Sequence, residues 1–372
     1  MKKILIMAKA LGGGGAEVAL IELLNKLDYN KYEIKLLLLD TDEEYKYRLK
    51  KNIDIEYIKF DSNFLKRLVS GYSFTSKVLK KLSINKYISY YDFIMNHLTN
   101  NFNQIYDIAI DFYGYGYFLT AVLAKKVHAQ KKYSWVHDEK LGWFESVYKY
   151  HNEIDKFYGV SESVCKVLTN KYPDLKNKVE VFYNVVDIEG IKKKSSEFIP
   201  DEMTSEFNIL TVGRLHEQKG YDIAIKAAAL LKSKGIAFTW YAIGSGRDEA
   251  KLKKLIATYR LENTFVLLGR KDNPYPYMKM CDLYVQPSRH EGYGLTVLEA
   301  KVLHKPIIVS NLQVFLEQIS DDCNGVVADL NPTALATKIE WLYKNSEARE
   351  RYVEKLKEEN IDFSKEIEKL YS

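Results

Sequence analysis

Cysteine is scarce in this sequence. Only Cys165, Cys281 and Cys323 occur in 372 residues, and they lie far apart with no Cys-x-x-Cys or Cys/His spacing. An odd, scattered set of this kind indicates neither a disulfide framework nor a zinc site. A reducing compartment fits best, so we expect a cytoplasmic protein.

Long hydrophobic runs are also absent. The short apolar run that ends near Met7 is followed by Lys9 and by the glycines that begin at Gly12, so it is shorter than the apolar core of a signal peptide. No stretch approaches the roughly 18 apolar residues that a membrane span needs. We therefore expect neither an exported nor an integral membrane protein.

Charge of one sign dominates in one segment only. The whole chain has 55 Lys and Arg against 50 Asp and Glu, a net charge of +5, which is mildly basic and does not indicate a nucleic-acid partner. Residues 64–91 contain six basic residues and no acidic one, interleaved with apolar and aromatic residues. This composition suits a peripheral contact with an anionic membrane at the inner face of the plasma membrane. A solvated basic helix face is the alternative.

Hydrophobic residues are plentiful, at 47% of the chain, and a core is therefore available. Because 372 residues exceed what one core usually supports, two domains are expected. Predicted strands alternate with predicted helices from Lys3–Met7 onward and again from Phe207–Val212 onward, which is typical of α/β domains with parallel sheets. The predicted boundaries are residues 1–183 for the first domain, 184–206 for a linker, 207–350 for the second domain, and 351–372 for a C-terminal helix that packs back on the first domain.

The richest segment for chemistry is Ser288–Ala300, which reads S-R-H-E-G-Y-G-L-T-V-L-E-A. A predicted strand ends just before it and a predicted helix begins near its middle. The first amides of that helix, from Leu295, Thr296 and Val297, would favour an anion such as a diphosphate. Gly294 allows close approach of the backbone. Glu299 can accept hydrogen bonds from vicinal hydroxyls, although an ordinary surface position is the alternative.

A second segment, Val212–Gly220, also lies between a predicted strand and a predicted helix. Arg214 and Lys219 are five residues apart on a loop bounded by glycines, so both cations can converge on one point. Two cations aimed at a diphosphate would stabilise its developing charge without a metal. Two solvated loop cations are the alternative.

Two weaker signals lie in the first domain. The run of four glycines from Gly12, with Gly14 and Gly15, follows a strand but lacks the Lys-Ser/Thr of a P-loop and the third glycine of a dinucleotide-binding motif. His137 follows another predicted strand, where it would lie at the rim of a ligand site, although a lone histidine is more often structural.

Together these segments resemble the family 4 retaining glycosyltransferases (glycosyl transferases group 1), which have the GT-B fold of two facing Rossmann-like domains with a deep interdomain cleft. The resemblance rests on motifs in the family's order: G-G-A-E at Gly14–Glu17, H-D at His137, G-R-L-x-x-x-K-G at Gly213–Gly220, G-x-G at Gly244–Gly246, and a pair of glutamates eight residues apart at Glu291 and Glu299.

The resemblance implies a role for each matched residue. Catalysis would rest on Glu291 at the transferred sugar, on Arg214 and Lys219 at the donor diphosphate, and on His137 near the sugar. The other donor-binding residues would be Gly14, Gly15, Gly244, Arg270 near the base, Gly294, the amides of Leu295, Thr296 and Val297, and Glu299 at the ribose.

The implied reaction is retaining transfer of a hexosyl group from a nucleotide diphosphate sugar, expected to be a UDP-hexose. The acceptor would be a saccharide or a polyprenyl-linked saccharide in surface polysaccharide biosynthesis, such as capsule assembly. No metal and no cofactor are expected. A nucleotide-sugar epimerase of the same architecture and a non-catalytic partner subunit are the alternatives.

Overall fold

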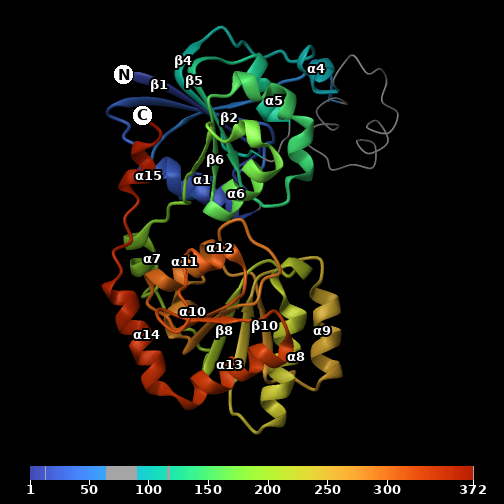
Figure 1. Cartoon of the computed structure of the whole chain (residues 1–372), viewed down its shortest axis with the longest axis vertical. Coiled ribbons are helices and arrows are strands. Elements are labelled where there is room, and N and C mark those ends of the chain that lie inside the picture. The colour runs from blue at the N-terminus through green and yellow to red at the C-terminus, as the bar shows by residue number, and fades with distance from the viewer. Residues whose placement is uncertain (13, 64–89, 115–117, 372) are drawn as a thin grey trace. The chain divides into compact units, whose positions relative to one another are not determined.

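The computed structural model describes residues 1–12, 14–63, 90–114 and 118–371 of the chain (Figure 1). Residues 64–91, predicted to contact a membrane, lie almost entirely outside these described residues, so that interpretation stays a prediction.

The described strands are β1 (Lys2–Ala8), β2 (Tyr32–Leu38), β3 (Asp54–Tyr57), β4 (Ile105–Asp111), β5 (His128–Val136), β6 (Lys156–Gly159), β7 (Val179–Val181), β8 (Asn208–Val212), β9 (Thr239–Ile243), β10 (Phe265–Gly269), β11 (Leu283–Gln286), β12 (Ile307–Ser310) and β13 (Val326–Ala328).

The described α-helices are α1 (Gly15–Lys26), α4 (Tyr90–Met95), α5 (Phe118–Lys125), α6 (Glu162–Lys171), α7 (Ile188–Lys194), α8 (Tyr221–Ser233), α9 (Glu249–Thr258), α10 (Tyr275–Met280), α11 (Leu295–Val302), α12 (Gln313–Leu316), α13 (Pro332–Lys344), α14 (Ser346–Glu358) and α15 (Ser364–Glu368). Short 3-10 helices are η1 (Lys46–Arg48), η2 (Leu141–Ser146), η3 (Tyr148–Glu153), η4 (Pro173–Leu175) and η5 (Glu217–Lys219).

The chain forms two compact units. The first unit comprises Met1–Val185 together with Phe363–Ser372, and the second comprises Val186–Asp362. In the described residues each unit contains one parallel sheet, of seven strands in the first unit and six in the second. The predicted α/β class with two Rossmann-like sheets is therefore confirmed.

The first sheet has the strand order β3-β2-β1-β4-β5-β6-β7. Its central strand β1 is apolar without alternation, and Ile4, Leu5, Ile6 and Met7 are all buried. A continuous apolar run is what a parallel strand requires when helices cover both faces of its sheet. The order of strands reverses between β1 and β4, so the loops that follow these two strands flank the crevice where such sheets bind ligands.

The second sheet has the strand order β10-β9-β8-β11-β12-β13. Its core contains the fully buried Trp240, whose indole N–H donates to the Thr211 hydroxyl at 3.0 Å, and that hydroxyl in turn donates to the carbonyl of Val285 at 2.6 Å. These two buried polar side chains are thus paired, as a close-packed core favours. The reversal here lies between β8 and β11, which positions the loops after these strands beside each other.

The predicted domain boundaries differ from the observed ones in two places. Residues 188–194, inside the predicted linker, form α7 and belong to the second unit. Asp187 begins this helix, because its carboxylate accepts from the Gly190 N–H at 3.1 Å. Three consecutive lysines at its end obscured the helix in the sequence.

The second difference concerns the C-terminus. Residues 351–358 continue α14 and pack into the core of the second unit through the buried Tyr352. Only residues 363–372, with α15, belong to the first unit. There the Lys369 ammonium donates to the carbonyl of Val181 at 2.8 Å and Tyr158 donates to the Lys369 carbonyl at 3.0 Å.

None of the helices in the described part of the chain combines the length and the apolar character that crossing a bilayer requires.

Candidate active site

The loop after β8, residues 213–220, is here called the lysine loop. Its last residue, Gly220, has φ +69°, and a Cβ there would lie 1.8 Å from the carbonyl oxygen of Pro287. Only glycine combines that backbone conformation with so close an approach. The loop is therefore pressed against the chain that follows β11.

The loop after β11, residues 287–294, is here called the glutamate loop. It ends at Gly294, which has φ +87° and where a Cβ would lie 2.6 Å from the Phe315 ring. α11 begins directly afterwards at Leu295. Because β8 and β11 pair in parallel at the reversal of the sheet, both loops leave from the same edge.

Lys219 and Glu291, predicted from different motifs, are in direct contact across these loops. The Lys219 ammonium lies 2.6 Å from Glu291 Oε1, and the two side chains are 13% and 8% exposed. The Ser288 hydroxyl donates to the same carboxylate oxygen at 2.7 Å. The pair compensates two charges that would each be costly to bury alone, and removal of one partner would leave the other uncompensated.

A chain of buried hydrogen bonds continues from Glu291 into the sheet. Gln286 Nε2 donates to the Ser288 hydroxyl at 2.9 Å, and Tyr284 donates to Gln286 Oε1 at 2.8 Å. Thr296 at the start of α11 donates to that oxygen at 3.3 Å. Sequence reasoning named Thr296 for its amide but missed Tyr284 and Gln286, although two polar side chains in the otherwise apolar β11 were a usable signal.

Arg214 is exposed, and none of the residues that the structure describes gives its guanidinium a polar partner. Gly244, with φ +149°, lies under this region, where a Cβ would be 1.9 Å from the Gly213 carbonyl oxygen. The predicted glycine therefore permits two loop backbones to touch. Arg214 therefore offers an exposed guanidinium on the same loop as Lys219.

The first amides of α11 differ from one another. The Val297 N–H donates to the carbonyl of Gly294 at 2.9 Å, so it is occupied within the helix. Among the described residues the amides of Leu295 and Thr296 have no such partner. Two of the three predicted anion-binding N–H groups thus remain available at this helix start.

Glu299 and Arg270 lie on other elements of the second unit. Glu299, on α11, is buried and accepts from the Tyr275 hydroxyl at 3.1 Å, so it is not the surface residue that the alternative interpretation described. Arg270 follows β10, is exposed, and lies 4.0 Å from the Asp272 carboxylate.

The predicted residues of the first unit lie at the ends of β1 and β5. Gly14 caps α1, its carbonyl accepts from Val18 at 3.2 Å, and Gly15 is the exposed first residue of the helix. Glu17 approaches Gly14 closely, since a Cβ on Gly14 would lie 3.1 Å from the Glu17 carboxylate. Gly13 lies outside the described residues.

His137 is buried, and its Nε2 lies 2.6 Å from the carbonyl oxygen of Phe112. Because a carbonyl only accepts, Nε2 carries the proton. Burial lowers the pKa of His137 to about 4, so the imidazole is neutral at pH 7. It holds the loop after β4 in place, and its contact with a ligand stays a prediction.

Asp111 at the end of β4 supports the same loop and was not predicted. It accepts from the Thr120 hydroxyl at 2.5 Å and from the Gly114 N–H at 3.1 Å. Burial raises the pKa of Asp111 to about 6 in spite of these hydrogen bonds.

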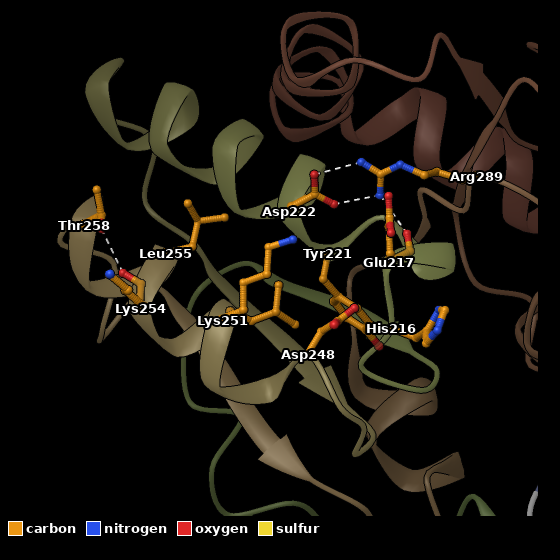
Figure 2. Close-up of a pocket in the computed structure, with 11 residues that line it drawn as sticks. His216, Glu217, Tyr221, Asp222, Asp248, Lys251, Lys254, Leu255, Thr258 and Arg289 are labelled. Carbon is orange, nitrogen blue, oxygen red and sulfur yellow. Dashed lines mark hydrogen bonds and ion pairs between the residues drawn. The ribbon is translucent and has the colours of Figure 1, made fainter. Parts of the chain in front are cut away.

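A cavity of about 250 Å³ lies beside the lysine loop, lined mostly by α8, α9 and that loop. Figure 2 shows His216 and Glu217 at its edge, with the Arg289 guanidinium facing Asp222. None of the predicted site residues lines this cavity. Elsewhere in the described residues, no group of three or more His, Cys, Asp or Glu side chains could hold a metal ion.

Comparison with known proteins gives a consistent family. The model of the glycosyl transferases group 1 family matches residues 192–359, nearly the whole second unit. An uncharacterized glycosyltransferase of Methanocaldococcus jannaschii is 34% identical over 54% of this chain and 54% of its own length. The N-acetylgalactosamine-N,N'-diacetylbacillosaminyl-diphospho-undecaprenol 4-alpha-N-acetylgalactosaminyltransferase of Campylobacter jejuni is 28% identical over 50% of each chain. The matches thus span about half the length of these relatives.

Among solved structures, Anabaena HepE in complex with UDP and glucose is similar over the whole chain. The TM-score is 0.75 at 17% sequence identity, over 100% of this chain and 98% of the other. At this identity the likeness shows the fold alone, which is the GT-B fold. Residues 192–359, which contain the lysine and glutamate loops, match the glycosyl transferases group 1 family, so this part of the chain is a glycosyl transferases group 1 domain.

Proposed function

We propose that this protein is a retaining glycosyltransferase that moves a hexosyl group from a UDP-hexose to a saccharide or a polyprenyl-linked saccharide in surface polysaccharide biosynthesis. The observation that carries the proposal is the buried contact of Lys219 with Glu291, beside an exposed cation without a partner, at the strand reversal of the second sheet.

The electrostatics of this edge suit a nucleoside diphosphate. Arg214 supplies an unpaired guanidinium, and the two amides at the start of α11 supply further donors. Lys219 is shared between Glu291 and an incoming phosphate, so its charge is held in place before the donor arrives. Such pre-organised donors stabilise the charge that develops as the nucleotide leaves.

Glu299 and Glu291 are proposed to contact the two remaining parts of the donor, the ribose and the transferred sugar. Glu299 accepts from Tyr275 and is proposed to accept from the ribose hydroxyls as well. Glu291, whose Oε1 already accepts from Lys219 and Ser288, is proposed to contact the transferred sugar.

The choice of substrates rests on the relatives. HepE was solved with UDP and glucose, and the Campylobacter relative is named for transfer to a diphospho-undecaprenol saccharide. A UDP-hexose donor and a lipid-linked acceptor are therefore the first to test.

In the proposed reaction, the bond from the anomeric carbon to the phosphate oxygen breaks, and its electron pair remains on the leaving diphosphate. The acceptor hydroxyl oxygen forms the new bond to that carbon on the same face. The acceptor's proton passes to the departing phosphate oxygen, which serves as the base. Arg214 and Lys219 stabilise the leaving charge, and no metal is needed in this scheme.

The test is release of UDP from a panel of UDP-hexoses in the presence of EDTA, with wild type, Lys219→Ala and Glu291→Ala. We expect slow hydrolysis of one donor by wild type and its loss in both variants. Conversion of the donor to an epimer instead would favour an epimerase. If the protein neither turns over nor binds any nucleotide sugar, a non-catalytic partner subunit is favoured.

A further inference from the structure

Arg289, one residue beyond the buried Ser288, connects the two loops of the site. Its backbone N–H donates to the carbonyl of Gln218 at 2.7 Å. Its Nη1 donates to the carbonyl of Glu217, also at 2.7 Å. Gln218 and Glu217 directly precede Lys219, so Arg289 contacts the chain on which that lysine is carried.

The same guanidinium forms a two-pronged ion pair with Asp222 in the first turn of α8. Nη1 lies 2.7 Å from Oδ1 and Nη2 lies 2.8 Å from Oδ2. Figure 2 shows the guanidinium facing the Asp222 carboxylate. Two parallel N–H···O bonds fix the plane of the guanidinium as well as its position. Arg289 therefore holds the segment on both sides of Lys219, at Glu217 and at Asp222.

The charges of the pair reinforce this geometry. Burial alone would raise the pKa of Asp222, but the hydrogen bonds and charge of Arg289 outweigh it and hold the pKa below its ordinary value. The hydrogen bonds with Asp222 likewise raise the pKa of Arg289. Both groups are thus charged throughout the neutral range.

The pair is better suited to position a loop than to stabilise the fold. Its side chains are 30% and 27% exposed, and partly exposed ion pairs contribute little to global stability. Its effect on Lys219 is local, because the loop between Gly213 and Gly220 is short and is fixed at its end by the contact of Gly220 with Pro287.

We propose that Arg289 and Asp222 are positioning residues, which hold the lysine loop so that the Lys219 ammonium meets both Glu291 and the donor diphosphate. This inference rests on the proposed function and adds two residues that neither the family motifs nor the sequence reasoning included. Arg289 acts through Lys219 and does not itself contact the nucleotide.

The experiment measures the affinity of the full chain for UDP by calorimetry. Arg289→Lys keeps the charge but cannot contact Asp222 in two places and Glu217 at once, so we expect the Kd for UDP to rise about tenfold, a loss of about 1.4 kcal/mol. Asp222→Asn leaves the Glu217 contact intact, and the rise should be smaller. Both variants should keep the melting temperature of wild type within a few degrees.

A double substitution separates positioning from direct contact. If Arg289 acts only through Lys219, then Arg289→Lys added to Lys219→Ala should leave the Kd of Lys219→Ala unchanged within about twofold. A further tenfold rise in that background would show that Arg289 binds the nucleotide itself, and the inference would be wrong. An unchanged Kd in Arg289→Lys alone would also overturn it.

The matched control is Arg351→Lys in the same unit. Arg351 pairs with Asp322 at 2.8 Å on the exposed surface and contacts neither loop, so its variant should bind UDP as wild type does. If Arg351→Lys lost as much affinity for UDP as Arg289→Lys, the loss would follow from breaking any surface ion pair, and the inference would be wrong. Failure of wild type to bind UDP at all would overturn the proposed function together with this inference.

Discussion

Ionisable groups at the strand ends of the two sheets differ in how their burial is compensated. In the first unit, Asp111 at the end of β4 and His137 after β5 are buried, and the hydrogen bonds described above for them are with neutral groups. In the second unit, Lys219 pairs with Glu291 and Arg289 pairs with Asp222. The first edge thus holds buried groups with shifted pKa values, and the second edge holds ion pairs.

The difference shows how burial is compensated in each case. At the first edge, burial shifts each pKa in the direction that favours the neutral form: up to about 6 for Asp111 and down to about 4 for His137. At the second edge, each ion pair offsets part of the cost of burying its two groups. The groups of the first edge hold a loop, and those of the second edge are the ones proposed to bind a diphosphate.

The largest expected effect comes from removing one charge at the second edge. Lys219→Ala leaves Glu291 buried without its cation and removes a donor to the diphosphate. We expect kcat/KM for UDP release to fall about 100-fold or more, by comparison with the loss of one oxyanion donor. Lys226→Ala, on the exposed face of α8, is the control and should leave turnover unchanged. Undiminished turnover in Lys219→Ala would remove Lys219 from the reaction.

The first edge should respond to pH instead. The pKa shifts of His137 and Asp111 should change the free energy of unfolding with pH in opposite directions. The pKa of His137 is lowered in the folded state, so its contribution to the free energy of unfolding is fully present above about pH 6.5 and is lost as pH falls toward 4. The folded pKa of Asp111 is raised, so stability is highest below about pH 4 and falls as pH rises through 6. In wild type the two contributions nearly cancel between pH 4 and 6.5.

Single substitutions should reveal the pH dependence of stability that each residue causes. Relative to wild type, Asp111→Asn should gain about 3 kcal/mol of unfolding free energy as pH rises from 4 to 6.5, and His137→Gln should lose a similar amount. Urea unfolding across this pH range measures both. Parallel pH profiles for the two variants would mean that burial does not control these groups.

Glycines at the two edges should separate stability from binding. Gly220 and Gly114 both have positive φ, and a Cβ on either would lie within 2 Å of a carbonyl oxygen, of Pro287 and Trp135 respectively. Each alanine substitution should cost about 2 kcal/mol of stability. Thermal unfolding and UDP calorimetry should show that both variants melt earlier, but that Gly220→Ala loses the larger share of affinity. If the two variants lost the same affinity for UDP, the second edge would have no special role in binding the nucleotide.

The smallest expected effect concerns the hydrogen bond from Ser288 to Glu291. Ser288→Ala removes one donor to Glu291 Oε1 while the ion pair remains, so the affinity for UDP should fall by about 1 kcal/mol. Ser310→Ala is the matched control, because the Ser310 hydroxyl is also buried but donates to the Ser288 carbonyl and not to Glu291. A larger loss in the control would contradict this assignment.

Much of the fold was predictable from local pattern. The apolar runs at β1 and β8 and the alternation of strands with helices predict both sheets, since buried parallel strands leave a strong signal in sequence. The short α7 was missed because its lysine-rich end lacks a repeating apolar face. The assignment of α14 to the second unit was missed because it depends on the burial of Tyr352 among residues distant in the chain.

The candidate site was predictable in part for the same reason. Glycines followed by a helix start, and cations on short loops, are local features, so Lys219, Glu291 and Gly294 could be named from the motifs. Arg289 and Asp222, which are 67 residues apart, have no local signature of their pairing. Asp111 was likewise missed, because an aspartate at the end of an apolar strand looks like an ordinary exposed residue.

The sequence by itself therefore determined the class of fold and the order of most elements, and it predicts a diphosphate ligand for the glycine-bounded loops. The tertiary structure alone decided which charges are paired and which pKa values shift. Hydrophobic periodicity and the residue types of a loop depend only on residues that are close together in the sequence. Burial and ion pairing arise only when strands distant in sequence become neighbours in a sheet and exclude water from the groups between them.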